Sequence, residues 1–450
     1  MLDRALSLFR KFKIDYGEFR EERDFSTSIS LRDRETSVSS GESRGISVRM
    51  LLLGSWGFAS TDDLSKVEEI FKKAYGLAKI SKGKSRVEID PSLSGKHKTK
   101  TKIPLEDIGV EDKMKDAREL QKLLEGKSIS STSVRYSDST STEGFVNTSG
   151  SECEQASMRV YAAFTSVAKN NGLMQRASER MGVSAGYEAV EQCFSLAQDC
   201  PKRAFALLSA SLAPAGKHLV IIDGRMTGLL CHEALGHACE ADSILAGSSI
   251  LKGKIGAGIG SPLVTIRDDP SIPGAFGSFA FDDEGVKSRG TILVEKGRLK
   301  NYLQSRETAA KLSSKPTGNA RAQAYAFTPI VRMSNTVMAR GESQVEELFE
   351  GLKHGVYARG MSGGCVDTTT GYFVFAAEDG YLIENGRKTK LLRDVLLSGN
   401  VVETLMNVDM VANDFLGSPG FCGKAGQSVP VSDGGPHVRV REVVVGGKAP

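Results

Sequence analysis

The 450-residue sequence has no long hydrophobic run, no marked excess of one charge, and only one tryptophan and 13 prolines. No apolar stretch approaches the ~20 residues that a membrane-spanning helix needs, so we expect no membrane association. The formal net charge is only +4 and both signs are interspersed, which argues against a nucleic-acid-binding protein. The seven cysteines lack framework spacing, and the charged N-terminus does not resemble a signal peptide. We therefore expect reduced thiols and a cytoplasmic location.

Glycine, in contrast, is abundant at 48 residues, which favours tight turns between strands. The length predicts two or three domains. Predicted strands and helices come in blocks rather than in strict alternation, so the expected fold class is α+β. We place the main boundary where Pro214 and Gly216 interrupt the helical pattern. This gives an N-terminal α+β domain at 1–213 and a strand-rich C-terminal domain at 214–450.

The periodicity of apolar residues predicts the individual elements. Helices are expected at 2–13, 62–77, 111–124, 187–212, 227–242 and 344–353. Strands are expected from 16 to 60, with turns at Gly41 and Gly45, and on both sides of Asn171-Gly172. Two short hairpins are expected at 291–302 and 380–391. The basic stretch from Lys96 to Lys102 predicts a solvated loop. The alternative, a nucleic-acid-binding arm, is disfavoured because no aromatic residue is interleaved.

The most informative segment runs from Cys231 to Glu240 and contains two of the six histidines, His232 and His237, with Glu233 directly after the first. Neutral imidazoles bind Zn²⁺ and can leave a position open for water. A bound metal lowers the pKa of that water, and an adjacent carboxylate can move its proton to a leaving amine. The segment therefore predicts metal-assisted hydrolysis. The alternative is a core helix whose histidines are simply hydrogen-bonded.

The spacing of the two histidines is unusual for a zinc site. Residues five apart lie ~140° apart around a regular α-helix, so their side chains do not converge easily. We therefore predict a π-type bulge, or an early helix end near Gly236, because glycine tolerates a distorted backbone. Glu240 would then lie on the same face, where it could support a histidine or contact substrate.

A third metal ligand must come from elsewhere in the sequence. Cys231 and Cys239 adjoin the histidines but diverge from them, and Glu240 remains a possible ligand. The other histidines, at 218, 354 and 437, are isolated. Cys422 stands out because it lies in a turn-rich, glycine-rich segment where packing alone would not require a thiol. Two histidines and a cysteine are a suitable donor set for zinc.

At these residues the chain resembles the TldD branch of the TldD/PmbA metallopeptidase family. The resemblance is carried in the C-terminal part by segments 232–237, 277–285, 316–321, 332–336, 363–367 and 422–431. Weaker matches in the N-terminal part lie at 45–49, 54–59 and 145–150. It implies that His232, His237 and Cys422 hold Zn²⁺ and that Glu233 is the catalytic carboxylate.

The resemblance also implies a two-domain subunit. The N-terminal domain would contribute to a peptide channel or to dimerisation, and 214–450 would be the metallopeptidase domain. It implies a homodimer, or a heterodimer with a PmbA-like homologue, and a channel in which an unfolded or flexible peptide is cut. A strand-rich wall would hold such a peptide as an extended strand through main-chain hydrogen bonds.

Two other functions remain as alternatives to a zinc-dependent peptidase. The first is a non-catalytic subunit that shapes the channel of a companion, against which the presence of Glu233 argues. The second is a structural zinc module, which a closed site with four protein ligands would support.

Overall fold

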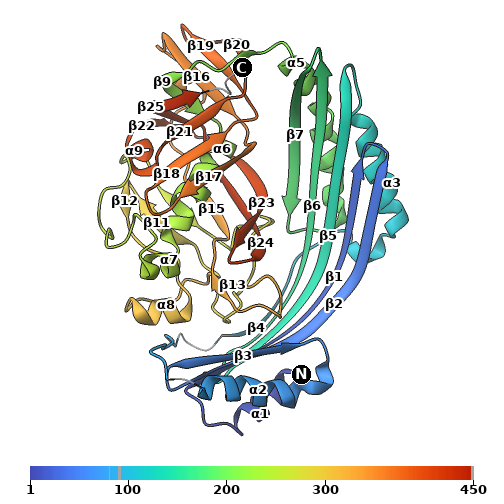
Figure 1. Cartoon of the computed structure of the whole chain (residues 1–450), viewed down its shortest axis with the longest axis vertical. Coiled ribbons are helices and arrows are strands. Elements are labelled where there is room, and N and C mark those ends of the chain that lie inside the picture. Colours follow the sequence, from blue (N-terminus) through green and yellow to red (C-terminus); the bar gives the residue numbers. More distant parts are fainter. Residues whose placement is uncertain (81, 90–92, 447–450) are drawn as a thin grey trace.

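The structure is a computed structural model that describes residues 1–80, 82–89 and 93–446, and its fold is α+β, as predicted. Figure 1 shows a sheet of very long strands that curves along one side of a strand-rich C-terminal part. Within the described ranges, no helix combines the length and the apolar character that crossing a membrane requires.

The first sheet has seven strands: β1 (Tyr16–Arg32), β2 (Glu35–Leu52), β3 (Ser55–Thr61), β4 (Ser94–Lys98), β5 (Ile129–Asn147), β6 (Glu152–Asn170) and β7 (Leu173–Val183). Four of them are 17 to 19 residues long, well above the usual ~5–6, because they serve two separate cores. At one end, helices α1 (Leu2–Phe9) and α2 (Val67–Lys79) pack around Phe19 and Phe71. At the other, α3 (Val110–Leu123), α4 (Glu191–Ala197) and α5 (Cys200–Leu207) cover Val160 and Phe164.

The turns of this sheet only partly follow the predictions. The hairpin at Asn171-Gly172 is confirmed, and both residues have positive φ. The turns expected at Gly41 and Gly45 are wrong, since both glycines lie inside β2 and the chain turns at Asp33 instead. Gly45 leaves room for the ring of Tyr325, because a Cβ at this position would lie 2.2 Å from that ring.

The basic stretch is exposed, as expected, but its first residues form a strand rather than a loop. Strand β4 pairs in parallel with β6, and Lys96 forms an ion pair with Glu154 at 3.0 Å.

Two predicted helices are corrected by the structure. The long helix at 187–212 is divided into a 3₁₀ turn, α4 and α5. Pro201 lacks an N–H and lies in the first turn of α5, which separates α5 from α4. The chain then enters the short strand β8 (Ser211–Leu212). The helix at 344–353 is only a 3₁₀ turn, Glu346–Leu348, and Gly351 follows with φ 71°.

The C-terminal part contains two larger sheets. One has ten strands: β8, β9 (Gly216–Ile222), β16 (His354–Arg359), β17 (Gly363–Asp367), β18 (Tyr372–Ala376), β19 (Asp379–Glu384), β20 (Arg387–Arg393), β21 (Leu396–Asn400), β22 (Val408–Val411) and β25 (Val438–Gly446). The other has six: β10 (Ile266–Asp268), β11 (Thr291–Glu295), β12 (Arg298–Leu299), β15 (Asn335–Met338), β23 (Leu416–Lys424) and β24 (Gln427–Gly435). Strands β13 (Ala320–Arg321) and β14 (Ile330–Val331) form a separate pair.

Both short hairpins of this part are confirmed. Their turns lie at Lys296-Gly297 and Asn385-Gly386, and all four residues have positive φ. The domain boundary at 214 stays a prediction.

A broken helix lies between the two larger sheets. It begins as α6 (Gly224–Leu229) and ends before α7 (Ala241–Ala246); α8 (Arg306–Lys311) and α9 (Val401–Met406) lie elsewhere in the C-terminal part. One apolar core joins Leu230 and Leu235 of the broken helix to Ile222 of β9 and Val431 of β24. Apolar burial on several sides therefore fixes where the predicted site residues point.

Buried ion pairs join the N-terminal sheet to the C-terminal part. Arg49 contacts Glu18 of its own sheet at 2.7 Å and Glu284 at 2.5 Å, and Arg20 contacts Asp283 at 2.6 Å. Segment 277–285, which carries part of the family resemblance, thus fixes the relative placement of the two parts.

Candidate metal centre

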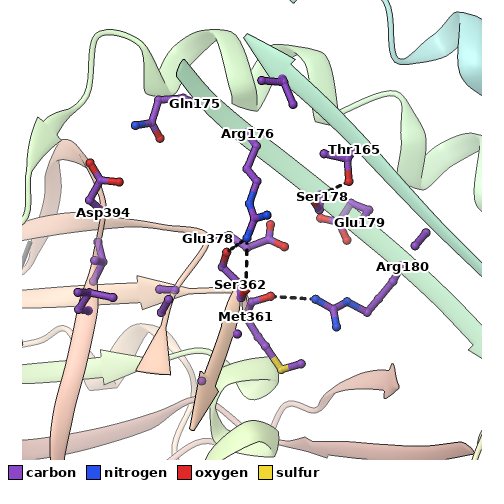
Figure 2. Close-up of a pocket in the computed structure, with 18 of the residues that line it drawn as sticks. Thr165, Gln175, Arg176, Ser178, Glu179, Arg180, Met361, Ser362, Glu378 and Asp394 are labelled. Carbon is purple, nitrogen blue, oxygen red and sulfur yellow. Dashed lines mark hydrogen bonds between the residues drawn. The ribbon is translucent and has the colours of Figure 1, made fainter. Parts of the chain in front are cut away.

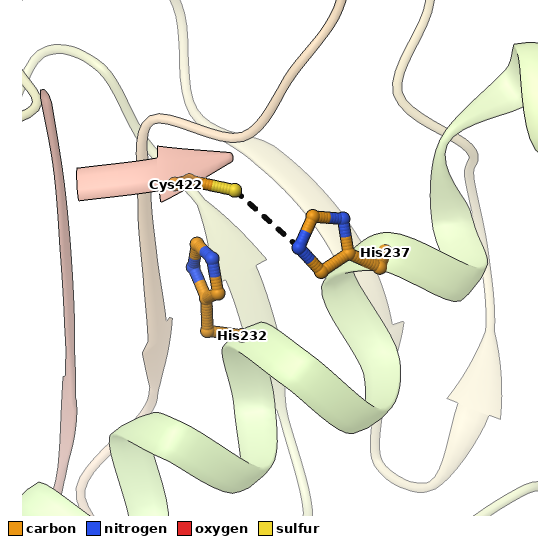
Figure 3. A group of neighbouring side chains, drawn as sticks. All are labelled: His232, His237 and Cys422. Carbon is orange, nitrogen blue, oxygen red and sulfur yellow. Dashed lines mark hydrogen bonds between the residues drawn. The ribbon is translucent and has the colours of Figure 1, made fainter. Parts of the chain in front are cut away.

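The helix that carries the two histidines is not a regular α-helix. Residues Leu230–Gly236 form a π-helix, and the N–H of His237 donates to the carbonyl of His232, five residues earlier. The two imidazole rings are 5.3 Å apart, and Figure 3 shows both on the side of the helix that faces Cys422. The predicted π-type distortion is confirmed, and it brings side chains at i and i+5 onto one face.

Gly236 has a different role from the one predicted. Its φ of −57° and ψ of −52° are ordinary helical values, so the backbone does not require glycine. A Cβ at this position would instead lie 2.0 Å from Sδ of Met333. Gly236 therefore lets the chain between β14 and β15 pack closely against the π-helix.

Cys422 meets the histidines from β23. Its Sγ lies 3.3 Å from Nε2 of His237, and one donor atom from each of His232, His237 and Cys422 lies within 4.8 Å of the others. The expectation of a turn-rich loop is wrong, because Cys422 is a strand residue and the tight turn follows at Ala425-Gly426. The strand gives the thiol a fixed direction towards the π-helix.

The electrostatics of this group favour a thiolate between two imidazoles. Burial opposes ionisation of Cys422, but hydrogen bonds with His232 and His237 outweigh it and lower the thiol pKa to about 4. Burial also disfavours the charged form of His237, yet Cys422 and Glu240 raise its pKa to about 10. A thiolate in these surroundings is a good ligand for a cation of intermediate softness.

His237 has a polar support on the Nδ1 side of its ring. Its Nδ1 lies 3.0 Å from Oε2 of Glu240, which is 1% exposed and also contacts Nζ of Lys424 at 3.0 Å. Lys424 donates to both oxygens of Asp242 at 2.8 Å and to the carbonyl of Val331 at 3.0 Å. Burial alone would raise the pKa of Glu240, but the contacts with His237 and Lys424 lower it. Glu240 thus supports a histidine, one of the roles predicted.

Sequence reasoning missed Lys424 and Asp242. A signal for Lys424 was available, because it follows Cys422 by two residues on one strand and so points to the same side. Nothing in the sequence indicated that Asp242 would meet it.

His232 lacks such a support. Its Nδ1 is buried and has no hydrogen-bond partner among the described residues, and Oδ1 of the buried Asp433 is equally unpaired. The two groups lie near each other, since a Cβ at Gly228, one turn before His232, would stand 2.5 Å from this Oδ1. Burial raises the pKa of Asp433 to about 7, against the opposing effect of His232.

Two motifs from the sequence brace the strand that carries Cys422. The buried guanidinium of Arg332 donates to the carbonyl of Cys422, and also to that of Gln427 at 3.3 Å. The side-chain amide of Asn319 donates to the carbonyl of Arg332 at 3.0 Å and to Asp268 at 2.8 Å. Segments 316–321 and 332–336 therefore hold the geometry of the donor group rather than add donors to it.

Glu233 lies at the open side of the group. Its carboxylate is 4.0 Å from Nε2 of His237, and its side chain is 29% exposed. Cys231 and Cys239 are fully buried in the apolar core and lie outside the donor group, as do the histidines at 218, 354 and 437. His437 is instead held by Asp414 and Tyr357.

The residues present fit a zinc ion. Two imidazoles and an ionised thiol converge, and the described residues supply no fourth protein donor within the same cluster.

A groove of about 1010 Å³ lies between the N-terminal sheet and the ten-stranded sheet. Its lining residues come mainly from β6 and β7 on one side and from β17, β18 and β21 on the other. Among the described strands, β7 pairs only with β6, and β17 pairs only with β18. Figure 2 shows Arg176 and Arg180 of β7 reaching across it to Ser362 and Met361. Strand β17 also packs against the π-helix, and β7 packs against β23. Both walls of the groove therefore touch an element that carries a candidate ligand.

Comparison with known proteins agrees with the fold. Three family models match the chain in order: PmbA/TldA metallopeptidase domain 1 at 17–78, the central domain at 103–208 and the C-terminal domain at 215–447. The chain belongs to the PmbA/TldD metallopeptidase family.

Several curated relatives are similar over nearly their whole length. A metalloprotease from Methanothermobacter thermautotrophicus is 42% identical, over 97% of this chain and 96% of its own. A zinc metalloprotease TldD homolog from Saccharolobus solfataricus is 33% identical, over 96% of both chains. The solved structure of TldE from Thermococcus kodakarensis has a TM-score of 0.79 at 20% identity and covers 99% of both chains. That last likeness shows the fold.

Proposed function

We propose that the protein is a zinc-dependent peptidase that hydrolyses unfolded or flexible peptides. The observation that carries the proposal is the convergence of His232, His237 and Cys422, with Glu233 beside them on the exposed side. A bound zinc ion would polarise the scissile carbonyl and acidify a water molecule. Glu233 would take the proton of that water and deliver it to the leaving amine.

The groove supports the choice of extended substrates. The edges of β7 and β17 that no other described strand occupies can each pair with a peptide main chain, which selects for chains without stable structure rather than for one sequence. A second cavity of about 390 Å³ lies beyond Tyr161 and the rings of Phe276 and Phe421, which contact one another. Phe421 directly precedes Cys422, so a peptide that passes between the cavities would run close to the metal ligands.

The assembly and the compartment are parts of the same proposal. A homodimer, or a heterodimer with a PmbA-like homologue, agrees with family membership and with the exposed Tyr372 and Val374 on one face of β18. Light scattering of the purified chain, alone and mixed with a homologue, tests this. All seven cysteines are free thiols, which supports a reducing compartment such as the cytoplasm.

The decisive experiment separates metal binding from hydrolysis. Glu233→Gln should retain one zinc per chain but lose roughly 10²–10⁴-fold of the cleavage rate on an unfolded peptide, since it lacks the base. The matched control is Glu350→Gln, an exposed residue away from the site, which should cleave normally. Cleavage by Glu233→Gln within a few-fold of the wild-type rate would exclude this mechanism.

A further inference from the structure

A cavity of about 770 Å³ lies between the β11–β12 hairpin and the loop that follows α8. It shares no lining residue with the groove described above. Arg289, Lys300 and Lys315 surround its mouth, and none of the described residues that line it is acidic. The volume is within the range of ordinary small-molecule sites.

The floor of this cavity contains a polar side chain without a partner. Gln304 is 4% exposed, its Oε1 is buried, and its side-chain amide makes no hydrogen bond within the described part of the chain. The backbone holds the residue in place: the N–H of Gln304 donates to Oγ1 of Thr317 at 2.7 Å, and the N–H of Thr317 donates to the carbonyl of Gln304 at 3.3 Å. The hydroxyl of Ser314 is also buried and unpaired. Such groups are unfavourable in a folded protein unless something bonds to them.

The cations at the mouth are only weakly neutralised. Lys315 forms no ion pair with any described residue, and Arg289 donates to the carbonyl of Pro316 rather than to a carboxylate. Lys300 contacts Glu295 at 3.0 Å, but both side chains are 45% exposed, so water screens the pair. The cavity thus combines excess positive charge with unpaired polar groups.

We propose that this cavity binds a small phosphate-bearing molecule. Lys315, Arg289 and Lys300 would neutralise its phosphate oxygens, because ammonium and guanidinium groups form strong charge-assisted hydrogen bonds with them. The amide of Gln304 and the hydroxyl of Ser314 would bond to oxygens that reach the floor. Apolar lining residues, Ile255, Ile292 and Leu312, leave room for a non-polar portion.

The position of the cavity gives a bound molecule a connection to the metal centre. Leu303, directly before Gln304, donates its N–H to the carbonyl of Cys239 at 2.9 Å and accepts from the N–H of Ala241 at 3.0 Å. Glu240 lies between those two residues. Binding that orders Gln304 would therefore also restrain the backbone around the carboxylate that supports His237.

Calorimetric titration with inorganic pyrophosphate tests the proposal on the full-length Glu233→Gln protein, so the result does not depend on hydrolysis. Saturable binding is expected, and Lys315→Glu should weaken it about tenfold or more because it reverses a charge at the mouth. Gln304→Leu should weaken binding severalfold while the melting temperature is kept or raised. The control is Lys390→Glu, an exposed lysine of β20 away from the cavity, which should bind as the parent does.

Three results would overturn the proposal. One is the lack of saturable heat with the parent protein at millimolar pyrophosphate. Another is equal weakening by Lys315→Glu and Lys390→Glu, which would indicate general charge attraction. The third is binding of a single-stranded oligonucleotide without binding of pyrophosphate, which would indicate a nucleic-acid surface.

Discussion

The two ends of the π-helix hold their histidines in different ways. At the C-terminal end, His237 is fixed by a polar chain through Glu240 to Lys424 and Asp242, each contact between 2.8 and 3.0 Å. At the other end, His232 is 3% exposed, is surrounded by core residues and has an Nδ1 without a partner among the described residues. Hydrogen bonds orient His237, whereas packing orients His232.

This difference indicates how two histidines five residues apart could bind one ion. The π-helix brings both rings to one face, but it fixes neither ring about its own bonds. Glu240 removes that freedom for His237, while the close-packed core limits it for His232. Loss of a hydrogen bond should therefore weaken zinc binding more at the His237 end than at the His232 end. A change of packing volume should reduce the stability of the whole helix.

The largest expected effect concerns the residue that both histidines face. Cys422→Ala should lower zinc affinity by more than ~100-fold, because it removes one of the three proposed protein ligands rather than a supporting group. Competition with a chromogenic chelator measures this. Cys239→Ala is the matched control, a buried cysteine two residues from His237 that should keep its zinc. Zinc loss from the control together with zinc retention by Cys422→Ala would show that the thiol ligand is misassigned.

The next effect tests the polar support of His237. Glu240→Gln should weaken zinc binding by roughly 10–100-fold, since partners of ligating histidines usually contribute that much. Lys424→Met should weaken it less, because Glu240 would keep its bond to His237 and lose only a neighbouring charge. The same chelator competition, made on both variants, ranks them. An order with Lys424→Met as the more severe variant would contradict the arrangement described.

A smaller effect concerns packing against the π-helix. Gly236→Ala should destabilise the protein by about 1–3 kcal/mol, because the new methyl group overlaps Met333 and must displace it. In denaturant unfolding, the double variant Gly236→Ala/Met333→Ala should be more stable than the sum of the single effects predicts, since the shorter side chain frees the space. Additive effects would mean that this contact is not the constraint on Gly236.

Much of the candidate site could be predicted from sequence because its signals are local or carried by motifs. If His232 and His237 bind one ion, their five-residue spacing predicts a non-α geometry whatever the rest of the fold is. Cys422 was identified from its unusual segment and from the family resemblance. Asp433 and Met333 could not be placed, because their contacts depend on how β24 and the chain before β15 pack against the helix. The sequence of one segment does not determine how that segment aligns with a distant one.

In the fold, too, features with a local sequence signal could be predicted, whereas features set by tertiary packing could not. The hairpin at Asn171-Gly172 was predictable because those residues favour positive φ wherever they occur. The helix at 187–212 was predicted too long although Pro201 lay inside it, so a local signal was available and was outweighed by apolar periodicity. Gly45 was read as a turn, but its requirement comes from Tyr325, far away in the sequence. Errors of this second kind need the tertiary structure to correct them.

The smallest expected effect tests the His232 end directly. Asp433→Asn should change zinc affinity by less than ~3-fold, because Asp433 forms no hydrogen bond with His232 in this structure and packing already orients the ring. The substitution keeps the volume of the side chain, so it leaves the contact with Gly228 in place. The measurement is again chelator competition, with Glu240→Gln in the same series. If Asp433→Asn weakens zinc binding as strongly as Glu240→Gln does, both histidines have a carboxylate partner once zinc is bound. The difference between a hydrogen-bonded His237 and a packed His232 would then exist only in the zinc-free protein.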